Sequence, residues 1–522
     1  MPNHLKALIV ILVLATVVFA FARAPSCAVA ITAGDFKRRR NMWFAITLAA
    51  FLAHNFWVYI IATAALLLFA LPREQNKLAM YFFLLFAVPP IQAEITGLGI
   101  IKHFFAIDYF RLLSLAVLLP AYLLVRKQPE VIRFGRLLPD KFILGYFILN
   151  FVLMLAASTF TNTLRQAVFY NFIDYFLPYY VASRSMKSLQ DFRDALMSFV
   201  VAVLVMSAIG AFEMATHWLL YAAVGNALGI QWEWGTYLER TNTALRAQAS
   251  TGHAIALGYV MAVAFGFFFY LKKSVSNATV WNWGLAALVV GLISTLSRGP
   301  WVGAAAMLLI FVATGPAPLR GIVKMGVFGV FALPFLLATP LGEKFIALLP
   351  FVGSIEQGTL TYRQRLFEIG VSVIMQNPFF GAYTFFLSEE AQELRQGGGA
   401  NGLIDLGNTY LAIGLGNGLV GLSLFTGVFV TVGVGIFNGM RKLADRNSEL
   451  YLLGQVLLSV LIGILLMIFT VSSSLVIPMI YWSVAGLGIA YLRILALAKA
   501  PSNAPEAALG RAGFQPMAIR SR

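Results

Sequence analysis

Arginines beside turns are the groups in this sequence best suited to chemistry on an anionic ligand. Arg298 lies in the segment 296–301 (Leu-Ser-Arg-Gly-Pro-Trp), where glycine and proline favour a tight turn. Arg363 and Arg365 open an apolar-periodic segment, and Arg246 lies shortly before a predicted helix. A guanidinium grips phosphate oxygens with two parallel hydrogen bonds, which a lysine ammonium does not provide. Arginines that converge at one face would therefore bind phosphate or pyrophosphate.

Two other interpretations of these arginines stay open. An arginine at the edge of a membrane helix commonly extends toward lipid phosphates. Each arginine could instead pair with a nearby acid, such as Glu368, Glu239 or Glu356.

A second group of polar residues, 405–411 (Asp-Leu-Gly-Asn-Thr-Tyr-Leu), lies where the chain returns to apolar sequence. The carboxylate of Asp405 could accept a proton from a reacting hydroxyl. It could equally cap a helix that begins near Asn408, or pair with Arg363 or Arg365. The glycines of 414–421 predict a tight turn and a closely packed helix; no strand precedes them, so a dinucleotide site is not expected.

The remaining polar groups of the apolar segments favour structural roles. Asp108 and Arg111, three residues apart, predict an internal ion pair. Asp174 and Glu213 are lone acids that could line a cavity or pair with a neighbouring helix, and we favour the packing role. His253 has no histidine or cysteine partner at ligand spacing, so no metal is expected, and it is either an interfacial residue or a ligand-binding one. The sequence has no Walker loop and no Asp-x-Asp pair, and we expect no cofactor.

The elements that must position these residues lie in lipid. Of 522 residues, 60% are hydrophobic and 11% are charged, which exceeds the apolar content that a water-facing surface permits. The net charge of +16 does not form a stripe interleaved with exposed aromatic residues, so nucleic acid is not an expected partner. The single cysteine, Cys27, excludes an intrachain disulfide.

The chain is predicted to be an all-α polytopic membrane protein with about fourteen transmembrane helices. The first apolar run resembles a signal peptide in part, but further spans follow, and we expect an uncleaved anchor. Basic residues on both sides of 42–71 can both be cytoplasmic only if this segment is a helical hairpin that turns at His54-Asn55, so one span or two stays open here. The expected spans lie near residues 5–22, 42–71, 78–95, 105–125, 142–158, 168–183, 195–216, 254–271, 280–296, 300–315, 321–340, 416–437, 450–470 and 474–496.

Lysine and arginine clusters between the spans predict the orientation, because such clusters stay in the cytoplasm. The expected layout is eleven transmembrane helices in 1–340, a large periplasmic loop in 341–408, further helices in 409–498 and a disordered cytoplasmic tail in 499–522. Within the loop, Gln376-Asn377-Pro378 predicts a helix stop. The clusters are Arg126 to Lys141, Arg184 to Arg193, Lys272-Lys273, Arg320 to Lys324, Arg441 to Arg446 and the tail after Lys499.

Across residues 240–440 the order of these motifs resembles the O-antigen polymerase and ligase superfamily, membrane glycosyltransferases of the GT-C type. Residues 297–301 match that family's Ser-Arg-Gly-x-Trp turn, and the segment from Arg246 to His253 is similar to the one that enters its central helix. Arg363 stands four residues before Phe367, as in an Arg-x-x-x-Trp motif with phenylalanine for tryptophan. Residues 376–381 are similar to the x-x-Pro-x-x-Gly that follows.

The resemblance implies that Arg298 and Arg363 bind the pyrophosphate of an undecaprenyl-linked glycan and stabilise its charge as it leaves, without a metal. Arg246, Arg365, His253, Asn408 and Tyr410 would complete the substrate site. Residues 408–411 are similar to the family's His-Asn-x-x-Leu, but Gly407 stands in place of the histidine. Because that histidine is the expected base in the ligase branch, its absence favours a polymerase, in which Asp405 could take the proton.

The resemblance thus implies a polysaccharide polymerase of O-antigen or exopolysaccharide biosynthesis in the bacterial inner membrane, with its active site facing the periplasm. A chain-length co-polymerase and a flippase are the expected protein partners, beside membrane lipids and the lipid-linked oligosaccharide. The alternatives are a ligase that moves the glycan to lipid A core or to a protein, and a flippase of lipid-linked sugars. A transporter built from repeats should show related halves, which this sequence lacks.

Overall fold

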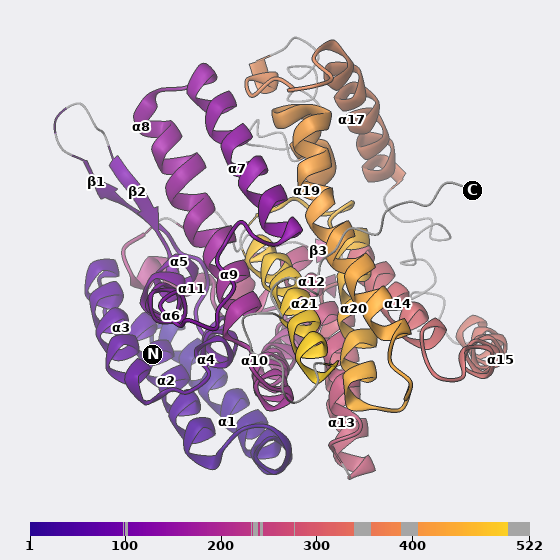
Figure 1. Ribbon diagram of the computed structural model, residues 1–522. Helices are drawn as coiled ribbons and strands as arrows, with labels where there is room; N and C mark the ends of the chain where they lie inside the picture. Colours follow the sequence, from indigo (N-terminus) through magenta and orange to yellow (C-terminus); the bar gives the residue numbers. More distant parts are fainter. Residues whose placement is uncertain are drawn as a thin grey trace, which may run out of the picture.

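The protein is a bundle of membrane helices, seen in a computed structural model (Figure 1). The prediction of an all-α polytopic membrane protein is confirmed. Eight helices of the described residues are long and apolar enough to cross a membrane, and three shorter apolar helices accompany them. The structure describes residues 1–97, 99, 103–230, 232, 239–240, 244–275, 277–338, 357–387, 406–474 and 476–499.

The first half of the chain packs around one long buried helix, α10. The N-cap of this helix is Ser188, whose side chain accepts from the backbone N–H of Asp191, while the Asp191 carboxylate accepts from the Ser188 backbone N–H. Helices α1, α4, α12 and α13 all contact α10. The helices are α1 Asn3–Val29, α2 Ala33–Leu52, α3 Phe56–Ala70, α4 Lys77–Leu84, α5 Tyr109–Leu113, α6 Leu119–Val125, α7 Leu138–Ala157, α8 Phe160–Thr163, α9 Leu177–Ser185, α10 Leu189–Thr216 and α11 Ala222–Ala227.

The second half adds helices that pack on one another and back on α7 and α9. Two short antiparallel hairpins, β1–β2 and β3–β4, are the strands of the described chain, and Figure 1 shows β1 and β2 beside α8. The elements are β1 Ala93–Thr96, β2 His103–Ile107, β3 Glu239–Arg240, β4 Ala244–Leu245, α12 Ala254–Leu271, α13 Ala278–Ser294, α14 Arg298–Ala313, α15 Pro318–Leu337, α17 Gln357–Gln376, α19 Thr409–Arg441, α20 Glu449–Met467 and α21 Ile477–Lys499.

The predicted hairpin in 42–71 is confirmed. Helix α2 ends at Leu52, and His54 adopts a left-handed backbone with φ of 51°. The side chain of Asn55 then accepts from the backbone N–H groups of Trp57 and Val58, at 2.9 and 3.2 Å, and so caps α3.

The predicted span at 78–95 is wrong, because α4 ends at Leu84. Pro89-Pro90 cannot donate backbone hydrogen bonds, and a proline disfavours helix in the residue before it. The chain from Leu85 to Ile91 is instead buried and irregular, which membrane proteins tolerate only inside protein or along a cavity. Side-chain hydroxyl groups donate to backbone carbonyls of this irregular segment: Tyr109 donates to the carbonyl of Leu84 at 2.7 Å, and Ser250 donates to the carbonyl of Phe86 at 2.6 Å.

The lysine- and arginine-rich loops gather at one end of the bundle, here called the basic end. Arg193 bonds to Glu449 at 2.6 Å, and the ammonium of Lys273 donates to the carbonyl of Asn447. These contacts join three of the loops that the sequence placed on one side of the membrane. The charge pattern therefore predicted correctly which of these loops lie together.

The same geometry places the N-terminal end of α1 away from the basic end. The imidazole rings of His4 and His54 are 5.7 Å apart, while the carbonyl of Ala30, after α1, accepts from Gln190 at the basic end. Helix α1 therefore runs from the far end of the bundle to the basic end. The tail from residue 500 lies outside the described residues.

Candidate functional site

The segment that carries Arg246 lies directly on the turn before α14. Its guanidinium donates to the hydroxyl of Ser297 at 3.0 Å and to the carbonyl of Thr295 at 3.4 Å. The backbone N–H of Ala247 donates to the carbonyl of Ser294 at 3.0 Å. These three bonds hold the Arg246 segment to a turn that lies about fifty residues later in the chain.

Glu213, at the end of α10, fixes the backbone that follows Arg246. Its carboxylate is fully buried and accepts from the backbone N–H groups of Leu220, Gln248 and Ala249, at 3.0, 2.9 and 2.8 Å. Three N–H donors satisfy a buried carboxylate well. The sequence indicated a packing role for Glu213, but the partners belong to a loop that only the fold brings to it.

Helix α12 starts at this loop. His253 is its N-cap, and its Nδ1 accepts from the backbone N–H of Ile255 at 3.2 Å. A Cβ added at Gly258 would lie 2.8 Å from Cγ of Pro300, so the helix and the turn of α14 are in direct contact. His253 therefore caps α12 and lies beside the turn before α14.

Arg298 is the first residue of α14 and is half-buried. A Cβ on the next residue, Gly299, would overlap the hydroxyl of Thr470. Thr470 belongs to the segment 468–471, which follows α20 and also binds Thr409 at the start of α19. The backbone N–H and the hydroxyl of Thr409 donate to carbonyls of this segment at 2.9 and 2.7 Å. Segment 468–471 thus contacts both the turn before α14 and Thr409 of the polar group 405–411.

Asn408 is the N-cap of α19. Its side-chain oxygen accepts from the backbone N–H groups of Tyr410 and Leu411, at 2.9 and 3.1 Å. The hydroxyl of Tyr410 donates to the carbonyl of Leu465 at 2.8 Å. Asn408 fills the capping position that the sequence offered to Asp405, and Tyr410 ties α19 to α20.

Arg363 and Arg365 lie on α17, and both are exposed. The ring of Phe367 lies 6.5 Å from that of Phe469, the neighbour of Thr470. Figure 1 shows α17 beside α19, and the two helices pack against each other. The shared apolar side chains are Leu366, Val373, Leu411 and Leu415.

Helix α19 is broken at Gly418, where the backbone has φ of 65° and ψ of −169°. The loop after α17 satisfies the groups that the break exposes. Carbonyls of Pro378 and Phe379 accept from the N–H groups of Leu419 and Val420, at 2.8 and 3.1 Å. The predicted helix stop is confirmed, since α17 ends at Gln376.

Gly381 completes this contact. Its φ is 67°, and an added Cβ would overlap the carbonyl of Leu415. The next N–H, of Ala382, donates to that same carbonyl at 2.7 Å. The spacing of proline and glycine in 376–381 thus matches a loop that seals a broken membrane helix.

The proposed acids have mixed outcomes. Asp405, Glu356 and the side chain of Glu239 lie outside the described residues. Glu368 accepts from the amide of Gln364 at 3.0 Å, one turn away on α17. The role of Asp405 as the base that accepts the acceptor proton therefore stays a prediction.

A separate charged cluster confirms the predicted Asp108–Arg111 pair and extends it. The two groups lie 3.8 Å apart, and Arg111 also bonds to Asp174 at 3.1 Å. Its guanidinium stacks over the ring of Tyr170, 3.7 Å from the centroid. Asp174 therefore has the partner on a neighbouring element that we expected.

Comparison with known proteins assigns this region. Residues 283–426 match the family model described as O-antigen ligase, a span that runs from α13 to beyond the break in α19 and contains Arg298, Arg363 and Asn408. No curated protein matches the chain. The match over residues 283–426 supports the resemblance of this region to the O-antigen polymerase and ligase superfamily.

Proposed function

We propose that the protein is a metal-independent polysaccharide polymerase of the GT-C type. It transfers an undecaprenyl-pyrophosphate-linked glycan to the next lipid-linked repeat unit at the periplasmic face of the inner membrane. The observation that carries the proposal is the bond between Arg246 and Ser297, which holds one arginine against the turn that leads into α14 at Arg298.

Two arginines on one turn suit a pyrophosphate leaving group. In the reaction, a hydroxyl oxygen of the acceptor sugar bonds to the anomeric carbon of the donor, and the bond from that carbon to the pyrophosphate oxygen breaks. The electron pair stays on the pyrophosphate, and guanidinium groups stabilise the added charge. The acceptor proton passes to a base, for which Asp405 remains the candidate.

Arg363 and Arg365 extend the site from the side of α17. The two residues are exposed, and they lie on a helix that packs on α19, close to the segment 468–471 that contacts Gly299. Arg363 would bind the second phosphate of the donor pyrophosphate, or the glycan. In this proposal α17 belongs to a periplasmic loop, residues 341–408. The tail 499–522 would then be cytoplasmic.

Transfer to lipid A core or to a protein is the second candidate, favoured by the description of the matching family as O-antigen ligase. The polymerase is preferred because Gly407, with φ of 52°, stands where the ligase motif has its histidine. Among the described residues, no atom lies within 4 Å of a Cβ added there.

The test is a reaction with purified protein and lipid-linked repeat units as the sole substrate. A polymerase yields a ladder of longer lipid-linked glycans and releases undecaprenyl pyrophosphate. A ligase gives product only when lipid A core or an acceptor protein is added. A flippase moves the lipid-linked sugar across vesicles without forming a glycosidic bond, and that result would overturn the proposal.

A further inference from the structure

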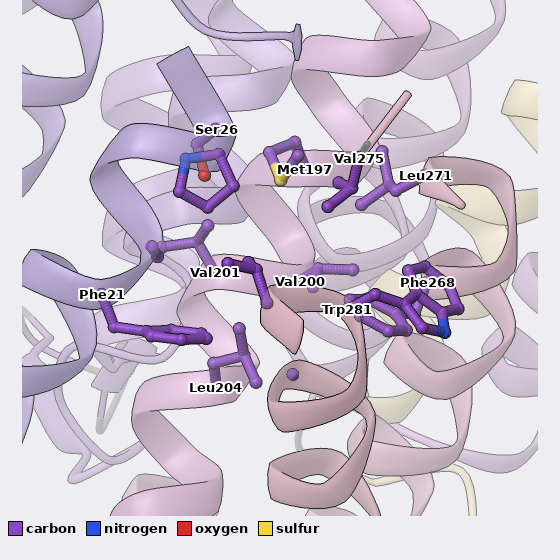
Figure 2. A pocket seen from close by; sticks show the side chains of 14 residues that line it. Phe21, Ser26, Met197, Val200, Val201, Leu204, Phe268, Leu271, Val275 and Trp281 are labelled. Carbon is purple, nitrogen blue, oxygen red and sulfur yellow. The ribbon is translucent and has the colours of Figure 1, made fainter. Parts of the chain in front are cut away.

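A groove at the basic end of the bundle is lined by α1, α10, α12 and α13. It encloses about 380 Å³, counting the part that opens to the surroundings. Figure 2 shows Phe21 and Leu204 on one side of this space, and Phe268 and Trp281 stacked on the other. The two stacked rings have centroids 4.0 Å apart and nearly parallel planes. The site already described lies at the opposite ends of α10 and α12, around Glu213 and His253.

One end of the groove is polar. Ser26 lines it near the end of α1, and its side-chain oxygen is buried without a hydrogen-bond partner among the described residues. The residue as a whole is 1% exposed. A buried hydroxyl without a partner is unfavourable, and a ligand that carries an acceptor would relieve this cost.

A lysine stands at the same end. Lys272 follows the lining residue Leu271, and the helical period puts it on the face of α12 that carries Phe268 and Leu271. Lys272 is exposed, and among the described residues its ammonium makes no hydrogen bond or ion pair, although its backbone N–H donates to the carbonyl of Phe269. The next lysine, Lys273, donates to the carbonyl of Asn447 instead.

The other charged groups near this end have different surroundings. On α10, Asp194 pairs with Arg39, and Arg193 pairs with Glu449. Arg23 on α1 is exposed and adds positive charge. The mouth of the groove therefore carries net positive charge above an apolar floor.

We propose that this groove binds an anionic phospholipid, with its phosphate at Lys272, an ester carbonyl at the hydroxyl of Ser26 and an acyl chain along Phe21, Leu204 and Trp281. From Ser26 to Phe21 the groove descends five residues of α1, or roughly 7 Å at 1.5 Å per residue, so it holds the upper part of one chain. A polyprenyl phosphate has no ester carbonyl to accept from Ser26. A zwitterionic lipid carries its own cation and gains less from Lys272.

The test uses bromine on the acyl chain, which quenches tryptophan fluorescence at contact. The full chain is reconstituted in vesicles of phosphatidylethanolamine that contain a minor share of brominated phosphatidylglycerol, or the same share of brominated phosphatidylethanolamine. The signal of Trp281 is the difference between wild type and Trp281→Phe, a variant that keeps the ring stack. We expect the phosphatidylglycerol to quench this signal about fivefold more effectively, the preference that one lysine near the surface provides.

Matched variants separate the contributions of Lys272 and Ser26 to lipid binding. Lys272→Gln should abolish the preference, whereas Lys273→Gln should keep it. Ester-linked phosphatidylglycerol should outcompete its ether-linked analogue in wild type but not in Ser26→Ala. Trp283, exposed on the same helix, should be quenched equally by both lipids.

Three results would overturn the inference. The first is equal quenching of the Trp281 signal by the two brominated lipids. The second is a preference that Lys272→Gln retains. The third is complete relief of quenching by an equimolar amount of polyprenyl phosphate, which would assign the groove to the lipid carrier instead.

Discussion

Arg246 donates a hydrogen bond of 3.0 Å to the hydroxyl of Ser297, across 51 positions of the chain. The contact puts one guanidinium on the turn where another, Arg298, begins α14. Glu213 secures the far side of the same segment through bonds to Gln248 and Ala249. The candidate anion site therefore depends on three elements that must keep their relative positions.

Replacement of the arginines by lysine tests the phosphate-binding role. Arg298→Lys and Arg363→Lys keep the charge but lose bidentate geometry, so polymer formation from purified lipid-linked repeats should fall by about tenfold or more. Thermal stability should barely change. Arg441→Lys, at the basic end, is the matched control and should polymerise normally. Wild-type rates for both active-site variants would refute the role.

Glu213 should act by positioning Arg246. Glu213→Gln places an amide N–H₂ where the backbone presents N–H donors, and it should cost about 1–3 kcal/mol of stability. Because the Arg246 segment is then misplaced, the KM for the lipid-linked donor should rise as it does in Arg246→Ala. The double variant should be no worse than Arg246→Ala. Glu368→Gln, an exposed change on α17, is the control. Additive effects in the double variant would separate the two residues.

The break in α19 should require glycine at 418 but not at 416. An alanine at Gly418 would take a backbone conformation, φ 65° and ψ −169°, that is essentially restricted to glycine and costs about 1–3 kcal/mol, and its Cβ would overlap the carbonyl of Phe379. Gly418→Ala should therefore lower the unfolding temperature in detergent and reduce the yield of folded protein. Gly416→Ala should be neutral, because no atom of the described chain lies within 4 Å of its added Cβ. Equal stability of the two variants would contradict the docked loop.

Substitutions should assign the role of general base to Asp405 and the role of helix N-cap to Asn408. Asp405→Asn should lower the polymerisation rate by roughly 10²-fold with normal expression, if the carboxylate takes the acceptor proton. Asn408→Asp keeps a capping oxygen and should stay stable, whereas Asn408→Ala should lose about 1 kcal/mol. Rates measured with purified lipid-linked repeats and melting curves check both parts. Near-normal polymer from Asp405→Asn would remove Asp405 as the base.

Cysteine labelling tests the orientation. In a Cys27→Ser background, an impermeant thiol reagent should label Asn3→Cys and Glu368→Cys in intact spheroplasts, because the start of α1 and α17 should face the periplasm. Asn447→Cys and Ser502→Cys should react only after the membrane is opened. Labelling of Asn447→Cys from outside would reverse the proposed orientation.

The sequence alone determined the class of protein and most helix positions. Lipid requires long apolar runs, and basic residues punctuate them, so α12 was predicted at its observed bounds, 254–271. The turn at His54-Asn55 and the helix stop at Gln376 were also predictable, because local backbone preferences and side-chain caps decide them. The predicted span at 78–95 was wrong because a helix does not continue through Pro89-Pro90, and α4 ends at Leu84.

Only the tertiary structure decided which polar groups meet. Hydrophobic periodicity carries no information on the partners of a buried carboxylate, so the bonds from Glu213 to Gln248 and Ala249 could not be foreseen. The same holds for Asn408, which fills the cap that the sequence also offered to Asp405, and for the break at Gly418, whose exposed groups bond to a loop forty residues earlier. In each case the physical reason is that buried backbone groups must find partners, and those partners come from segments that are distant in the chain.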